Sequence, residues 1–101
     1  MASLSIIYWR DIPAQVVVRH GRQTAKVQLS ARFQKAVDRA AMRAGKGSSD
    51  AYLADWKRSE PRTCGEDIQA EAAAEAARIE ASFSDAALEA LIRAKGLAAG
   101  S

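Results

Sequence analysis

Segments of strand character come first in this chain and segments of helical character follow, and this order limits the folds available to it. Leu4–Arg10 is dense in β-branched and aromatic residues, Ala14–Arg19 contains three consecutive valines, and Thr24–Leu29 alternates between apolar and polar residues. Turn signals at Asp11–Pro13 and His20–Gln23 separate these segments. The sequence therefore predicts three N-terminal strands.

The later part of the chain has the spacing of helices. Ala31–Ala44 lies between Ser30, a favourable N-cap, and Gly45, a favourable residue just after a helix end. Glu66–Phe83 is rich in alanine and glutamate, and its large apolar residues share one stripe. Ala86–Lys95 carries a leucine and isoleucine face. Three helices are predicted over these segments.

The segment Asp50–Arg58 fits two structures. Tyr52 and Trp56 are four residues apart, as on one face of a short helix. Together with Ala54 they also alternate, as on one face of a strand. The helix is the preferred prediction, and Ser59–Gly65 is predicted to be a loop.

Strands followed by helices predict an α+β fold, with a small, mainly antiparallel sheet of about three N-terminal strands packed by three to four helices. The length of 101 residues is that of one small domain. We expect residues 1–96 to form this single domain and residues 97–101 to form a flexible C-terminal tail. A small sheet leaves edge strands, at which a second copy of the chain could pair.

The sequence has no apolar run of about 18 residues, so no transmembrane helix is predicted. The N-terminus does not have the order of a secretory signal, and the expected location is the cytoplasm. One cysteine and one histidine are too few for a Cys/His zinc site. No metal and no cofactor are predicted.

The charges are distributed unevenly along the chain. Met1–Arg62 has twelve Lys and Arg against five Asp and Glu, a net charge of +7. Thr63–Ser101 has three against seven, a net charge of −4. This asymmetry predicts ion pairs within the molecule or a surface that attracts an acidic partner.

The sequence offers few residues for catalysis. Cys64 and His20 are the one nucleophile and base of the usual kind, and nothing in the sequence places these two residues together. Glu71 and Glu75 are four apart on an alanine-rich helix, where a solvated face is the expected role. The chain is therefore predicted not to be an enzyme.

A basic stripe follows the helix predicted over residues 31–44. Arg32, Lys35, Arg39 and Arg43 project from one side of it, and Met42 lies beside them with no place in the apolar face. The stripe could engage an acidic protein or follow a phosphate backbone weakly. The sequence has no nucleic-acid-binding motif, and its acidic C-terminal part would repel phosphates, so the second role is the alternative.

Aromatic residues beside cations are the other candidates for contact. Tryptophan, tyrosine and arginine are the usual anchors of protein interfaces, although core packing is the ordinary role of a tryptophan in so small a chain. The chain is predicted to be a non-catalytic interaction or accessory module, with a protein partner or a second copy of itself. Its candidate contact residues are Trp9, Arg10, Asp11, Arg32, Lys35, Arg39, Met42, Arg43, Tyr52 and Trp56.

Three segments, Tyr8–Val16, Asp38–Gly45 and Ala51–Trp56, resemble the small bacterial virulence factor domain. The likeness runs from about Leu4 to Phe83, and the same domain type is found within the larger conserved virulence factor C proteins. Stand-alone members tend to be encoded near methylenetetrahydrofolate reductase and components of corrinoid-dependent methyltransferases. The resemblance therefore implies a cytoplasmic accessory protein beside one-carbon methyl-transfer enzymes, and it carries no catalytic residues to this chain.

Overall fold

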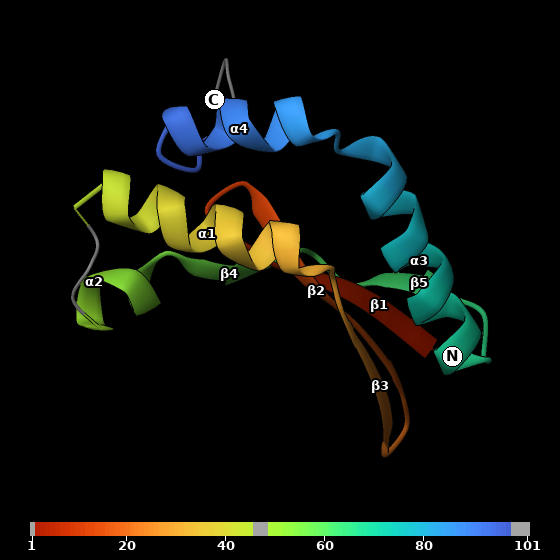
Figure 1. The fold of residues 1–101 in the computed structure, drawn as a ribbon. Coiled ribbons are helices and arrows are strands. Elements are labelled where there is room, and N and C mark those ends of the chain that lie inside the picture. Colours follow the sequence, from red (N-terminus) through yellow and green to blue (C-terminus); the bar gives the residue numbers. More distant parts are fainter. Residues whose placement is uncertain (1, 46–48, 98–101) are drawn as a thin grey trace.

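The computed structural model describes residues 2–45 and 49–97 and has five strands and four helices (Figure 1). The strands are β1 (Ala2–Trp9), β2 (Ile12–His20), β3 (Gln23–Gln28), β4 (Trp56–Arg58) and β5 (Arg62–Cys64). The helices are α1 (Ala31–Arg43), α2 (Ser49–Ala54), α3 (Ile68–Ser82) and α4 (Asp85–Arg93). The predicted α+β class is confirmed.

All five strands belong to one antiparallel sheet. The strand order is β3-β2-β1, and the far edge of β1 pairs with two short strands. β4 pairs with Ile7–Trp9, and β5 pairs with Ala2–Leu4. The eight residues of β1 are long enough to hold both short strands end to end.

The three N-terminal strands form where they are predicted, but the first turn is shorter than expected. Pro13 was predicted to lie between strands, whereas it lies inside β2 opposite Tyr8. The register shifts there, because Ile7 pairs with Gln15 and leaves Ala14 without an opposite residue. A bulge tolerates a proline, which has no N–H to donate to the ladder.

The three longer helices, α1, α3 and α4, are layered on one side of the sheet (Figure 1). α1 and α3 pack on the strands, and α4 lies mainly on α1, farther from the sheet (Figure 1). The core between these layers joins Leu4, Val16 and Val18 of the sheet to Phe33 of α1 and Ile79 of α3. Each of these five side chains is buried, so the layered packing provides most of the hydrophobic stabilisation.

The segment Asp50–Arg58, for which a helix and a strand were both considered, contains a short helix followed by a short strand. α2 ends at Ala54 and β4 begins at Trp56, so neither a helix nor a strand extends over the whole of residues 50–58. The loop predicted over Ser59–Gly65 is also a correction, because it contains β5. Both short strands form because they pair with the free edge of β1, which supplies their hydrogen bonds. Local sequence does not predict such pairing with a distant strand.

None of the helices in the described ranges has the length and the apolar character needed to cross a bilayer. Leu97 is exposed just beyond the last turn of α4. The rest of the predicted C-terminal tail, residues 98–101, lies outside the described residues.

Candidate functional site

Trp9 lies in the core and not on the surface. Its side chain is completely buried, and its indole Nε1–H donates a hydrogen bond to the carbonyl oxygen of Tyr52 at 2.9 Å. The two rings stack with their centroids 6.0 Å apart. The prediction that Trp9 contacts a partner is therefore corrected, because a side chain buried in this way stabilises the fold instead.

Arg10 is held by contacts within the molecule. Its guanidinium lies 5.2 Å from the ring centroid of Trp9, its Nε is 3.3 Å from Oδ2 of Asp55, and its Nη1 donates to the carbonyl of Lys95 at 2.8 Å. Arg10 also has a positive φ of 54°, in the turn between β1 and β2. The guanidinium therefore connects this turn to the α2–β4 junction and to the C-terminal end of α4.

Asp11 completes the same connection. Its backbone N–H donates to the carbonyl of Gly96 at 2.8 Å, and its carboxylate lies 3.3 Å from Nζ of Lys57. The segment Trp9–Arg10–Asp11 is thus a clasp that holds β4 and the end of α4 against β1. This role accounts for the aromatic and charged residues that the sequence places there.

Tyr52 and Trp56 extend the aromatic contact outward from Trp9. Their rings meet edge to face with centroids 5.8 Å apart, and both side chains are half-buried. Leu53, between them in the sequence, is 62% exposed. Tyr52 and Trp56 therefore combine packing with a partly accessible surface, whereas Trp9 is wholly enclosed.

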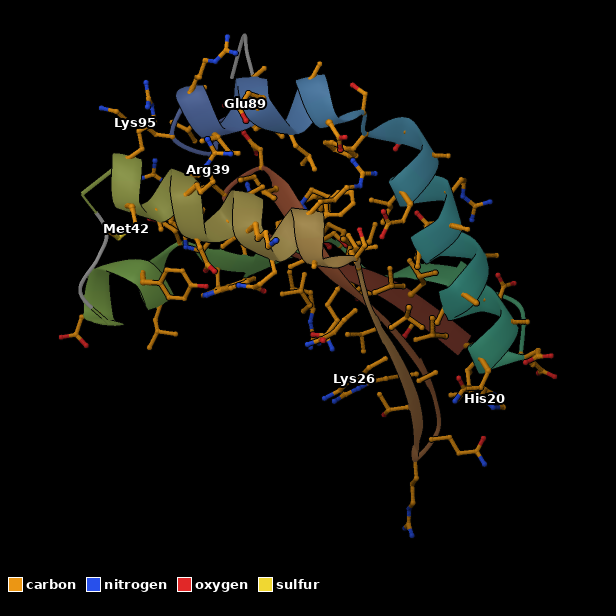
Figure 2. All side chains as sticks on the ribbon, in the orientation of Figure 1. His20, Lys26, Arg39, Met42, Glu89 and Lys95 are labelled. Carbon is orange, nitrogen blue, oxygen red and sulfur yellow. The ribbon has the colours of Figure 1, made fainter. Side chains whose placement is uncertain are left out.

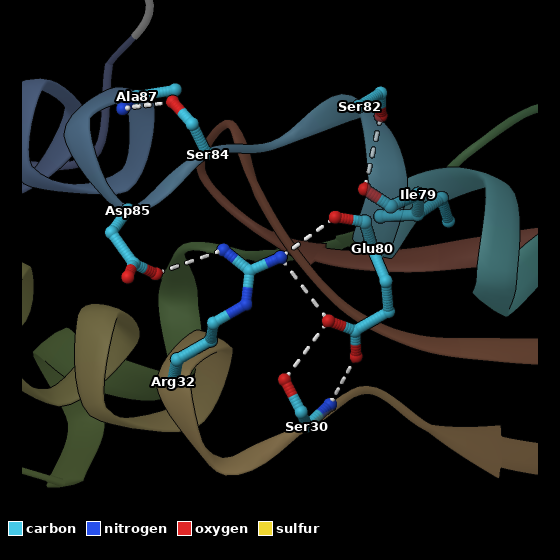
Figure 3. Close-up of polar contacts among 8 residues, drawn as sticks. All are labelled: Ser30, Arg32, Ile79, Glu80, Ser82, Ser84, Asp85 and Ala87. Atoms are coloured by element: carbon cyan, nitrogen blue, oxygen red, sulfur yellow. Dashed lines mark hydrogen bonds and ion pairs between the residues drawn. The ribbon is translucent and has the colours of Figure 1, made fainter.

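Arg32, at the start of the predicted basic stripe, is paired within the molecule (Figure 3). Its Nη2 donates to the carbonyl oxygen of Glu80 at 2.7 Å and to its Oε1 at 3.2 Å, and its Nη1 is 3.3 Å from Oδ1 of Asp85. The same Glu80 carboxylate accepts from the backbone N–H of Ser30 at 2.6 Å and from its hydroxyl at 3.0 Å. The network ties the start of α1 to the junction of α3 and α4.

Ser30 precedes α1 as predicted, but its side chain makes no capping hydrogen bond. Its hydroxyl donates to Glu80 instead, and the carboxylate that receives it comes from α3. Ser84, in contrast, caps α4 by accepting from the N–H of Ala87 at 3.0 Å (Figure 3). At the start of α1, the hydrogen bond from Ser30 to Glu80 of α3 therefore takes the place of a local capping hydrogen bond.

Replacing Glu80 with glutamine should make stability less dependent on pH in the acid range. Partial burial raises the pKa of the Glu80 carboxyl, but hydrogen bonds from Ser30 and Arg32 outweigh it and hold the pKa below its usual value. A depressed pKa stabilises the fold above the unfolded pKa of about 4.3, and this contribution disappears as the pH falls through the lower, folded value.

The measurement is urea denaturation of both proteins at pH 7 and at points between pH 5 and pH 2. The stability difference between wild type and Glu80→Gln should shrink as the pH falls. A difference that stays constant over this range would contradict the assignment.

The middle of the stripe is also partly neutralised. Arg39 forms an ion pair with Glu89 of α4, with Nη1 3.2 Å from Oε2. Lys35 and Arg43 make no ion pair or side-chain hydrogen bond within the described part of the chain. The stripe is thus a mixture of paired and unpaired cations.

Met42 is the exposed apolar residue of this surface, at 73% of its full accessibility (Figure 2). It lines a shallow hollow of about 460 Å³ between α1 and α4, together with Asp38, Arg39, Arg43 and Ile92. We call these five residues the Met42 surface. It combines a flexible thioether side chain with an unpaired guanidinium, so it can cover an apolar group and bind a carboxylate at once.

The candidate nucleophile and base lie at the same end of the sheet, with β1 between them. Cys64 pairs with Ala2 on one edge of β1, and His20 follows Arg19, which pairs with Ser3 on the other edge. Two strand spacings amount to about 10 Å. Burial and the Glu71 carboxylate raise the pKa of the Cys64 thiol against the opposing effect of Arg62, which favours the unreactive thiol form.

The carboxylates Glu71 and Glu75 were predicted to lie on a solvated face, which is wrong for Glu75. That side chain is buried and accepts from Arg62 of β5 at 2.6 Å and from Arg78 of α3 at 2.5 Å. Glu71 accepts from the backbone N–H of Gly65 at 2.8 Å. Both carboxylates therefore help to join α3 to the segment around β5.

In residues 2–45 and 49–97, no three His, Cys, Asp or Glu side chains are grouped as metal ligands would be. Sequence reasoning missed Ile92 as part of the Met42 surface, because the residue fits the apolar face of α4. Only the packing of α4 beside α1 leaves Ile92 at the floor of the hollow.

A family model described as virulence factor matches residues 7–92 of the chain. The matched range contains the clasp, the Met42 surface and the strands β2 to β5. Comparisons with curated proteins and with solved structures gave no match.

Proposed function

The chain belongs to the virulence factor family, and we propose that it acts as a non-catalytic interaction module whose contact surface is the Met42 surface. The observation that carries this proposal is the 73% exposure of Met42 beside the unpaired Arg43. Covering a large apolar side chain removes it from water and is favourable. Methionine and arginine are also enriched in protein interfaces.

The partner fitted to this surface presents an apolar side chain beside a carboxylate. Ile92 and Met42 offer the apolar contact, and Arg43 offers a bidentate donor that no described acid of this chain occupies. Arg39 is already paired with Glu89 and contributes mainly its aliphatic stem. The module therefore recognises an acidic protein patch of small area.

The surroundings of Cys64, His20 and Glu75 support the proposal that the module is not catalytic. The Cys64 thiol has a raised pKa, and β1 lies between it and His20. The Glu75 carboxylate is neutralised by two arginines. None of these groups is prepared for general acid, general base or nucleophilic chemistry.

For the partner itself, we propose a one-carbon enzyme: methylenetetrahydrofolate reductase or a component of a corrinoid-dependent methyltransferase. This part rests on the family resemblance and not on the geometry. A second copy of the chain is the other candidate. Phosphate binding along α1 has less support, because Arg32 and Arg39 are paired with carboxylates of α3 and α4.

Arg43→Glu and Met42→Asp should each weaken binding to the purified enzymes at least tenfold, since each removes one half of the contact and adds repulsion from an acidic patch. Binding is measured by calorimetry, and self-association by sedimentation. Arg22→Glu, a matched charge reversal in the exposed β2–β3 turn, is the control. Equal binding by wild type and both Met42-surface variants would remove this surface from consideration.

A further inference from the structure

The sheet has a second face, which is turned away from α1 and α3. Leu4, Val16 and Val18 belong to the core beneath the helices, whereas Val17 and Ile7 lie outside that core cluster. Successive residues of a strand point to opposite faces, so Val17 and Ile7 mark the side turned away from these helices. We call this side the open sheet face.

Three cations lie on the open sheet face, each on a different strand. Lys26 of β3 pairs in register with Val17, and Arg58 of β4 pairs with Ile7, which places both on this face. Arg19 lies two residues beyond Val17 on β2 and so on the same side. Figure 2 shows Lys26 extending from β3 away from the helices.

These cations are exposed and unpaired. Arg19, Lys26 and Arg58 make no ion pair or side-chain hydrogen bond within residues 2–45 and 49–97. By register, the other positions of this face on β1, β2 and β3 hold Val17 and Ile7 together with serine, threonine and glutamine side chains, and no carboxylate. The exposed carboxylate of Glu60 lies at the margin, in the β4–β5 loop.

On the helical side of the molecule, several arginines are paired with carboxylates. There Arg32, Arg39 and Arg78 each meet a glutamate of the helical layer. Three glutamates of the C-terminal half thus neutralise helix arginines, whereas Arg19, Lys26 and Arg58 keep their charge on the strands.

We propose that the open sheet face binds single-stranded nucleic acid through its phosphate backbone. Strands are about 4.8 Å apart and residues rise by about 3.3 Å, so Arg19 and Lys26 lie about 8 Å apart and Arg58 about 16 Å from either. A flexible single strand can follow such a diagonal of cations. Trp56, two positions before Arg58, packs its half-buried ring against the core and Tyr52, so the contacts of this face come from the three cations.

The composition of the face favours nucleic acid over protein. Protein interfaces have apolar centres rich in aromatic residues and methionine, whereas interfaces with nucleic acid are more polar and more positive. Here the central apolar residue, Val17, is only 4% exposed. The contacts are to phosphates, so the binding carries little sequence preference.

The test is fluorescence anisotropy of a labelled 15-nucleotide single-stranded RNA, with single-stranded DNA, duplex DNA and labelled polyglutamate as separate arms. Wild type should bind both single strands more tightly than the duplex or polyglutamate. With three phosphate contacts, the logarithm of affinity should fall against the logarithm of salt concentration with a slope of about −2.

The triple variant Arg19→Glu, Lys26→Glu, Arg58→Glu should bind single strands at least tenfold more weakly. The control is Lys35→Glu, Arg93→Glu with Lys95→Glu, which makes the same change in net charge at three exposed cations of the helical layer and should lose less than threefold. Equal losses in the two triple variants would mean that net charge alone drives binding. That result, an unaffected sheet variant, or tighter binding of polyglutamate than of RNA would overturn the proposal. Thermal unfolding confirms that each variant is folded.

Discussion

Replacing Trp9 with alanine is expected to lower the free energy of unfolding by about 3 to 5 kcal/mol, the cost of emptying a large buried aromatic site. The ring is completely buried, stacks on Tyr52 and supports the guanidinium of Arg10. Its Nε1–H also satisfies the carbonyl at the end of α2, which would lose that donor. A domain of this size has a total stability of only about 5 to 15 kcal/mol, so the variant should be marginally folded.

Urea denaturation followed by circular dichroism measures this loss without relying on tryptophan emission. Met42→Ala is the control, because truncating a side chain that is 73% exposed should change stability by less than about 0.5 kcal/mol. A Trp9→Ala variant as stable as wild type would show that the clasp does not hold β4 and α4 in place.

The second large effect is expected at Gly96, where alanine should cost about 2 to 4 kcal/mol. Gly96 has a φ of +87°, and a Cβ built there would lie 2.8 Å from Cζ3 of Trp9. The backbone conformation alone is strained for any residue with a Cβ, and the rigid ring adds a steric conflict. The substitution therefore displaces either the indole or the end of α4, whose carbonyl at Gly96 accepts from Asp11.

Gly21→Ala separates these two contributions. Gly21 has a similar φ of +62°, but a Cβ there would meet nothing within 4 Å. It reports the backbone cost alone, of about 1 kcal/mol. In a Trp9→Ala background the steric part of the Gly96→Ala effect should disappear, and the cost should fall to the Gly21 level. A cost that remains unchanged in the double variant would contradict the contact with the ring.

Local pattern was sufficient for the longer elements. The three valines of β2, the alternation in β3 and the apolar spacing of α1 each identify an element without help from the rest of the chain. Gly45 follows α1 with a positive φ, as predicted. The short elements were harder, because three residues such as those of β5 carry no period.

The candidate contact residues illustrate a different difficulty. Trp9, Tyr52 and Met42 all qualify as interface anchors by residue type, yet the first is enclosed, the second is half-buried and the third is exposed. Residue type sets what a side chain can do, whereas accessibility depends on which distant segment covers it. The same holds for charge, since Arg39 is paired and Arg43 is not.

The order of strands and helices, the basic front and the acidic C-terminal part follow from the sequence by itself, because periodicity and charge are local properties of the chain. Which arginines are neutralised, which tryptophan is enclosed and which face of the sheet stays uncovered were decided only by the tertiary structure. The physical reason is that ion pairs such as Arg32–Glu80 and edge pairings such as β1–β5 join residues about 50 or more positions apart. Their free energy appears only when packing brings those segments together.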